Sequence, residues 1–168
     1  MSNTTPSALL TLEAVSKAFG PVRVIDDVTV HIRPGQVQVL LGENGAGKST
    51  LIKMMAGIYQ PDRGRILVDG QPVELPNALA AERLGIAIIH QELNLVPSLS
   101  VAENVMMGRY PRRFGLVDRR ELRRRAQAAL DMIGLRVDLD QKVGQLGIAR
   151  QQLVEIAKAL SLNARVLI

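Results

Sequence analysis

The residues best suited to chemistry lie in one glycine-rich stretch. Residues 42–49 read Gly-Glu-Asn-Gly-Ala-Gly-Lys-Ser and fit the pattern G-x-x-x-x-G-K-[ST] at every fixed position. Glycines let the backbone curl tightly, so that its N–H groups point inward as a nest for an anion. The Lys48 ammonium can reach the β- and γ-phosphates of a nucleotide, and the Ser49 hydroxyl can bind Mg²⁺. The pattern therefore predicts a loop that binds the phosphates of ATP together with Mg²⁺.

The neighbouring elements must hold this loop in place. Residues 36–41, which end in a continuous apolar stretch, predict a buried parallel strand that enters the loop, and residues 50–58 predict a helix that leaves it. The helix would add the positive end of its dipole to the phosphate site. This order favours a phosphate site over a glycine-rich turn that contains a lysine by accident. The expected contacts with the nucleotide are Gly42, Glu43, Asn44, Gly45, Ala46, Gly47, Lys48, Ser49 and Thr50.

The remaining sequence indicates an antiparallel β piece, an α/β core and a helical segment. β-branched runs and turn residues predict strands at 8–16, 22–33, 85–89 and 166–168, and a hairpin at 65–73 with its bend at Asp69-Gly70. Apolar periodicity predicts helices at 79–84, 119–133 and about 149–161, the second capped by Asp118 and Gly134.

Composition narrows the class of protein. A chain of 168 residues suits one domain, and 47% hydrophobic with 22% charged residues is a globular balance. The absence of cysteine excludes disulfides and thiolate metal sites. No apolar run approaches the roughly 18 residues of a membrane span, and the polar N-terminus lacks a signal-peptide core. These features predict a cytoplasmic protein.

The net charge of +5 is concentrated in one stretch of the chain. Residues 109–125 contain eight arginines against Asp118 and Glu121. One interpretation is a surface for nucleic acid or anionic lipid, and the other is a solvated helix face, which we favour. His31 and His90 are interpreted as structural residues, because neither has a second histidine at the spacing of a metal site.

Three further segments point to a family. Gln91 directly follows a predicted buried strand, residues 95–105 read Leu-Val-Pro-Ser-Leu-Ser-Val-Ala-Glu-Asn-Val, and residues 146–160 read Leu-Gly-Ile-Ala-Arg-Gln-Gln-Leu-Val-Glu-Ile-Ala-Lys-Ala-Leu. With these segments the chain resembles the ATPase subunit of an ABC transporter. It is most similar to the first of the two fused ATPase domains in bacterial importers of ribose, galactose, xylose and related monosaccharides. The resemblance runs from Leu9 to the last residue.

The resemblance implies a fold and an organisation. The fold would be α/β, a P-loop NTPase of the ABC type with an antiparallel β subdomain and an inserted helical subdomain. The β subdomain and P-loop core would cover about 8–93, the helical subdomain about 94–160, and residues 164–168 would begin the Walker B strand. The acids that hold Mg²⁺ and polarise water would lie beyond Ile168. We therefore expect a C-terminally incomplete fragment that binds ATP but is hydrolytically incomplete.

The resemblance also assigns roles to individual residues. Phe19 matches the aromatic residue that stacks on adenine, with an ordinary core phenylalanine as the alternative. Gln91 matches the glutamine that contacts Mg²⁺ and the attacking water, so Lys48 and Gln91 are the catalytic candidates and Ser49 and Gln91 the metal ligands. The alternative for Gln91 is an ordinary exposed glutamine that contacts no ligand.

A third match is altered. Leu146, Gly147, Ile148, Ala149 and Arg150 stand where the family usually has Leu-Ser-Gly-Gly-Gln, the signature that contacts ATP on the opposite ATPase domain. Gly147 removes the signature hydroxyl, so we expect this half to complete the opposite site less effectively. The alternative is a first helical turn without a ligand.

The partners implied are membrane permease subunits, a second ATPase domain (fused or homologous) and, indirectly, a periplasmic sugar-binding protein. The chain would lie on the inner face of the cell membrane. The alternatives are a nucleotide-binding fragment without turnover, or a non-transport ABC-type ATPase acting on nucleic acid or ribosomes. A GTPase is not supported, because no Asn-Lys-x-Asp guanine reader is present.

Overall fold

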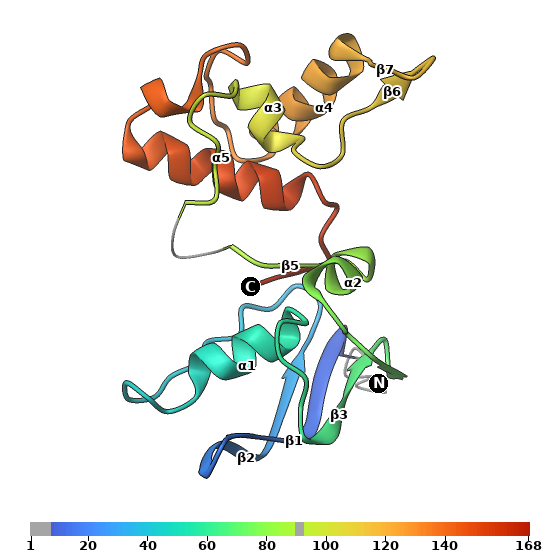
Figure 1. Ribbon diagram of the computed structural model, residues 1–168, viewed down its shortest axis with the longest axis vertical. Coiled ribbons are helices and arrows are strands. Elements are labelled where there is room, and N and C mark those ends of the chain that lie inside the picture. Colours follow the sequence, from blue (N-terminus) through green and yellow to red (C-terminus); the bar gives the residue numbers. More distant parts are fainter. Residues whose placement is uncertain (1–7, 90–92) are drawn as a thin grey trace, which may run out of the picture. The chain divides into compact units, whose positions relative to one another are not determined.

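The computed structural model describes residues 8–89 and 93–168, and the chain folds into two compact units. The first unit comprises the described residues up to Ala87 together with Arg165–Ile168. The second unit comprises the described residues of Ile88–Ala164. Figure 1 shows the helices and strands of each unit.

An antiparallel sheet of four strands forms the base of the first unit. Its strands lie in the order β2-β1-β3-β4 and are β1 (Leu10–Phe19), β2 (Val22–Ile32), β3 (Arg63–Val68) and β4 (Gln71–Val73). The predicted hairpin at Asp69-Gly70 is confirmed, with positive φ at both turn residues. Gly20, in the turn between β1 and β2, also has positive φ. Alternate residues of β1 (Leu10 and Leu12) are fully buried, as expected for one covered sheet face.

Two helices and a short parallel pair complete the first unit. Helix α1 (Lys48–Met55) buries Met54 and Met55 in the same core as β1. Helix α2 (Ala78–Arg83) is capped by Asn77, whose side chain accepts a bond from the Ala80 N–H. Strands β5 (Ile86–Ala87) and β8 (Val166–Leu167) pair in parallel, as Figure 1 shows.

An ion pair ties β8 to the antiparallel sheet. The Arg165 guanidinium donates two bonds of 2.7 Å to the Asp69 carboxylate, at the turn between β3 and β4. These bonds lower the pKa of Asp69 below its ordinary value. The ion pair therefore links the C-terminal segment of the unit to the turn between β3 and β4.

The predicted buried strand at residues 36–41 is wrong for the structure. No strand forms there within the described residues, and Val37 and Leu41 are 93% and 88% exposed. The segment and β8 both line an apolar groove of about 720 Å³, and β8 pairs only with β5 among the described strands. A strand needs a hydrogen-bonded neighbour, and this segment has none in the part of the chain that is described. Apolar residues alone do not supply the partner strand that this segment would need.

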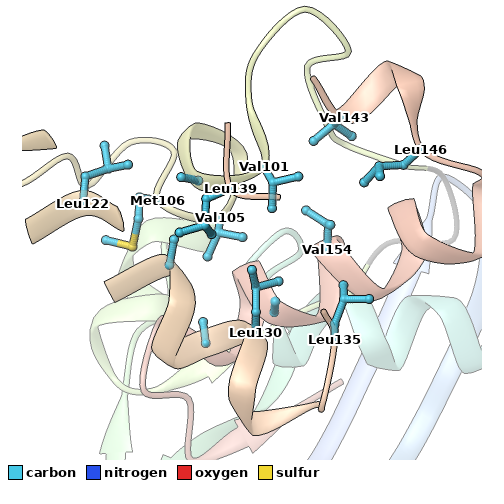
Figure 2. Close-up of a cluster of buried hydrophobic side chains, with 14 residues drawn as sticks. Val101, Val105, Met106, Leu122, Leu130, Leu135, Leu139, Val143, Leu146 and Val154 are labelled. Carbon is cyan, nitrogen blue, oxygen red and sulfur yellow. The ribbon is translucent and has the colours of Figure 1, made fainter. Parts of the chain in front are cut away.

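The second unit is built from three helices around one core. These are α3 (Val101–Val105), α4 (Arg119–Met132) and α5 (Ile148–Leu160), with a single 3₁₀ turn, η1, at Val143–Gln145. Figure 2 shows their apolar side chains converging, and Val101, Leu130 and Val154 are each 0% exposed. The predicted N-cap is confirmed, since the Asp118 side chain accepts a bond of 3.0 Å from the Glu121 N–H.

A buried asparagine fixes the loop before α3. Asn104 is 0% exposed, and its amide donates to the carbonyls of Val96, Leu99 and Ser100 while its oxygen accepts from the Val96 N–H at 2.8 Å. Ser100 and Glu103 form a capping box at the start of α3, which lowers the pKa of Glu103 mainly through the Ser100 N–H. The first turn of α3 therefore holds the preceding loop.

A small hairpin precedes α4 and was not predicted. Strands β6 (Arg112–Arg113) and β7 (Leu116–Val117) pair antiparallel across a two-residue turn.

The described helices include none that is long and apolar enough to cross a membrane.

Candidate functional site

The glycine-rich loop leads directly into α1. Gly45 and Gly47 have φ of 87° and 84°, the left-handed region that glycine adopts without strain. Gly47 is the N-cap of α1, and its carbonyl accepts bonds of 3.0 Å from the N–H groups of Thr50 and Leu51. The helix therefore begins at Lys48, inside the motif, as phosphate binding at a helix N-terminus requires.

The loop is seated on β2 by a close backbone approach at Gly47. A Cβ placed there would lie 2.5 Å from Cδ1 of Ile25 and 2.8 Å from the backbone oxygen of Val24. Gly47 is buried, whereas Gly42–Ala46 are exposed. The antiparallel sheet thus supports the start of the helix and leaves the rest of the loop open to a ligand.

Unbonded donors line this loop. In the described part of the chain, the N–H groups of Gly45, Gly47, Lys48 and Ser49 donate to no protein acceptor, and α1 has no side-chain cap. Such N–H groups, together with the positive end of the helix dipole, fit the charge and geometry of a polyphosphate. Among the described residues, no carboxylate caps the helix in competition with that ligand.

The Lys48 side chain folds back over the loop. Its ammonium donates to the carbonyl oxygens of Gly42 and Glu43 at 2.6 and 2.7 Å. These bonds hold the ammonium against the exposed part of the loop. The lysine is therefore oriented toward the side on which a phosphate would lie.

Mg²⁺ has only part of an expected site here. The exposed Ser49 hydroxyl has no protein hydrogen-bond partner among the described residues and fits the hard-oxygen chemistry of that ion. No group of three or more His, Cys, Asp or Glu residues in the described ranges has metal-binding geometry. Gln91, the second predicted ligand and catalytic candidate, lies outside the described residues.

Phe19 lies at the same end of the sheet as the loop. Gly47 contacts Ile25, Ile25 pairs with Lys17 across β1 and β2, and Phe19 is two residues further along β1. The ring is 41% exposed and meets Tyr59 edge to face, with centroids 5.2 Å apart. An exposed ring held by a second ring suits base stacking better than the alternative of a buried core phenylalanine.

Tyr59 is a residue that the sequence analysis missed. It follows α1 and packs against the core of the first unit, while its ring fixes the orientation of Phe19. The Lys17 ammonium lies 5.8 Å from the Phe19 ring and donates to Asp62 at 2.7 Å, which lowers the pKa of that carboxyl. The scarcity of aromatic residues was the only sequence signal that could have drawn attention to Tyr59.

The altered signature lies at the N-terminus of α5, in the second unit. Leu146 is buried in the core, while Gly147, Ile148, Ala149 and Arg150 are exposed. Gly147 is the N-cap and offers no side chain, and the N–H groups of Ile148 and Ala149 have no protein acceptor in the described chain. The segment therefore presents a helix end with free N–H groups but no hydroxyl.

Comparison with known proteins gives a consistent result. The ABC transporter family model matches residues 25–168. The ribose import ATP-binding protein RbsA of Corynebacterium glutamicum is 68% identical over 163 residues, covering 97% of this chain and 31% of that relative. The arabinose import ATP-binding protein AraG 1 of Burkholderia lata is 50% identical over 161 residues, covering 96% and 32%. The chain thus spans about a third of the length of the curated relatives it matches.

Solved structures share the fold. CbiO1 of Clostridium perfringens, part of the ABC transporter complex cbiONQ, aligns with a TM-score of 0.79 and 28% identity, over 96% of this chain and 64% of that one. The ATP-binding cassette MJ0796, in a dimeric post-hydrolysis state bound to ADP and Pi, aligns with a TM-score of 0.74 and 26% identity, over 94% and 72%. The predicted fold class, an ABC-type P-loop ATPase with an antiparallel sheet, is confirmed. From its loop, its fold and its family match, the chain belongs to the ABC transporter family.

Proposed function

We propose that this chain binds MgATP at residues 42–49 and, in the whole protein, provides ATP hydrolysis for the import of a monosaccharide. The observation that supports this most strongly is the set of unbonded N–H groups of Gly45, Gly47, Lys48 and Ser49, in a loop against which the Lys48 ammonium is held. Identity of 68% to a ribose import ATP-binding protein supports the sugar-import role.

Each residue has a specific part in this proposal. The loop N–H groups and Lys48 hold the β- and γ-phosphates, and Ser49 binds Mg²⁺. Phe19 stacks on adenine, with Tyr59 holding its ring. Gln91 would help to hold Mg²⁺ and to position the attacking water. Bound Mg²⁺ would supply positive charge that offsets the negative charge of the phosphates.

Displacement of a fluorescent ATP analogue tests the phosphate assignment. Because the loop holds the β- and γ-phosphates, ATP and ADP should displace the probe whereas AMP should not. Phe19→Leu should weaken the binding of ATP and of ADP by a similar factor, because both nucleotides carry the same base. Equal displacement by AMP and ATP would refute the placement of the phosphates on this loop.

We further propose that the chain works at the inner face of the membrane with permease subunits, a second ATPase domain and, indirectly, a periplasmic sugar-binding protein. A relative shares 68% identity and is a ribose import ATP-binding protein, which supports a permease partner. Co-purification of the chain with a coexpressed permease would test this. Recovery of the chain without permease in mild detergent would count against it.

We also propose that the altered signature, residues 146–150, makes a weak contact with ATP held by a second ATPase domain. The free N–H groups of Ile148 and Ala149 can contact a phosphate, but Gly147 lacks the hydroxyl. A Cβ at Gly147 would meet no atom within 4 Å, and its φ of −65° is ordinary, so serine fits. A hydroxyl bonded to a phosphate contributes about 1.5–3 kcal/mol.

ATP-dependent self-association provides the readout for the signature. Gly147→Ser should strengthen association by roughly tenfold or more when ATP and Mg²⁺ are present, and leave it unchanged without nucleotide. Sedimentation velocity measures the self-association. Gly144→Ser is not a suitable control, because a Cβ at that position would lie 3.0 Å from Pro97. Unchanged association with ATP would show that this segment does not reach a ligand.

A further inference from the structure

The hairpin β6–β7 exposes an apolar tip between unpaired arginines. Phe114 is 93% exposed, Leu116 76% and Val117 44%, although these side chains are large and hydrophobic. Phe114 and Gly115 form the two-residue turn with φ of 53° and 83°, as in a type I′ hairpin. The Asp118 N–H donates to the Pro111 carbonyl at 2.8 Å, which anchors the base of the hairpin. The tip is thus held outward by its own backbone.

The hairpin takes no part in the core of the second unit. None of its four strand residues belongs to the buried cluster of that unit or to the partly buried side chains packed on it, and only the flanking Tyr110 does. Figure 1 shows β6 and β7 at the periphery of the second unit, beyond the start of α4. A segment of such composition at the periphery needs a partner that takes both apolar and cationic groups.

Among the described residues, positive charge exceeds negative charge around the tip, although Arg119 also interacts electrostatically with Glu103. Arg112, Arg113, Arg119 and Arg120 are exposed and form no ion pair among the described residues. The nearby acids are already engaged. Asp118 caps α4, and Glu121 accepts bonds of 2.7 Å from Arg124 and Arg125, which hold its pKa at about 2.

Anionic lipid fits this combination better than nucleic acid does. Arginine guanidinium groups pair with lipid phosphates, and an aromatic and an aliphatic side chain can enter the boundary between headgroups and acyl chains. A nucleic-acid surface would use stacked rings, but this tip has one ring beside Leu116 and Val117, which cannot stack on bases. The Arg113 guanidinium already lies 5.4 Å from the Phe114 ring, so charge and ring are presented together.

We propose that the β6–β7 hairpin, with Arg119 and Arg120, is a membrane-contact surface for anionic phospholipid. Phe114 and Leu116 enter the interface while the arginines bind headgroup phosphates. This proposal is independent of nucleotide binding, because every residue it uses lies in the second unit. It also does not require the hairpin to contact a permease.

Vesicle flotation tests the proposal directly. The chain should bind vesicles of phosphatidylcholine with roughly one-third phosphatidylserine, and bind pure phosphatidylcholine far more weakly. The double variant Arg112→Gln/Arg113→Gln should lose roughly 25-fold in partitioning, at about fivefold per arginine near such a surface. Phe114→Ser/Leu116→Ser should lose roughly tenfold or more.

A charge-matched control separates this surface from general cationic attraction. Arg83 and Arg136 are also exposed and without an ion pair in the described chain, one in each unit. Arg83→Gln/Arg136→Gln should bind phosphatidylserine vesicles within about twofold of the parent chain. An equal loss in the control and the hairpin variant would overturn the proposal.

A fluorescent probe reports insertion independently of affinity. The chain contains no tryptophan, so Phe114→Trp introduces a single reporter at an exposed position. Its emission should shift to shorter wavelength with phosphatidylserine vesicles and stay unchanged with phosphatidylcholine alone. An unshifted emission on bound vesicles would overturn the proposal. So would salt-sensitive binding of single-stranded DNA that depends on the hairpin, without vesicle binding.

Discussion

The seat of the phosphate loop on β2 predicts a large difference between two glycines that have almost the same backbone conformation. Gly45 and Gly47 have φ of 87° and 84°, so alanine at either position incurs the left-handed strain of about 1–2 kcal/mol. At Gly45 a Cβ would meet nothing within 4 Å. At Gly47 it would lie 2.5 Å from Cδ1 of Ile25 and 2.8 Å from the Val24 oxygen.

The additional loss of stability in Gly47→Ala depends on how easily the two contacting atoms, the Ile25 methyl and the Val24 oxygen, can move away. The Ile25 methyl can leave its rotamer at about 0.5–1.5 kcal/mol, whereas the Val24 oxygen belongs to the backbone of β2 and can move only if the strand shifts. We therefore expect Gly47→Ala to destabilise the first unit by about 2–4 kcal/mol, and Gly45→Ala by about 1–2 kcal/mol.

The measurement must report on the first unit alone, because the chain has two compact units. Hydrogen exchange of β2 and α1 amides under urea, without nucleotide, gives the opening free energy of that unit. Amides of α5 in the second unit serve as an internal reference and should not change. Equal loss of protection in Gly45→Ala and Gly47→Ala would refute the close approach of the loop to β2.

Three predictions concern the second unit. Asn104→Ala removes the buried hydrogen bonds that hold the loop before α3, so it should lower the free energy of unfolding, measured with urea, by about 3 kcal/mol. A decrease below about 1 kcal/mol would contradict the role of Asn104 in holding this loop. Glu155→Gln should leave the free energy of unfolding unchanged or raise it slightly in the same assay. One buried oxygen of the Glu155 carboxylate has no partner in the described chain, and the Lys158 ammonium lies 3.6 Å from the other oxygen. A decrease above about 2 kcal/mol would contradict this reasoning. The pKa of Glu121 is lowered from 4.5 to about 2, so its stabilisation of α4 is full above pH 4.5 and disappears as the pH falls toward 2. Circular dichroism should show this loss, and Glu121→Gln should remove that part of the acid dependence.

The phosphate loop could be predicted from the sequence because its chemistry limits which residues can occupy it. Gly47 shows the reason, since any side chain there meets β2. The cap at Asp118 and the turn at Asp69-Gly70 were also predictable, because short polar side chains and glycine satisfy local backbone geometry. Local rules sufficed wherever the determining contacts were local.

Other features follow no simple rule that links sequence to structure. The run at residues 36–41 has the apolarity of a buried strand, but pairing requires a neighbour that sequence pattern does not reveal. The β6–β7 hairpin was missed because Phe114 occupies a turn position with φ of 53°, where asparagine or glycine is usual. The Asn104 clamp and the Tyr59 contact join residues whose spacing in the sequence carries no recognisable pattern.

Calorimetric titration of ATP with Mg²⁺ into the chain and into Lys48→Ala tests the central claim most directly. Loss of the charged donor from the phosphates should weaken binding by roughly ten- to 150-fold, corresponding to about 1.5–3 kcal/mol. Lys142→Ala, which removes an exposed lysine from the second unit, should leave the affinity unchanged. Equal ATP affinity in the parent chain and Lys48→Ala would contradict phosphate binding at residues 42–49.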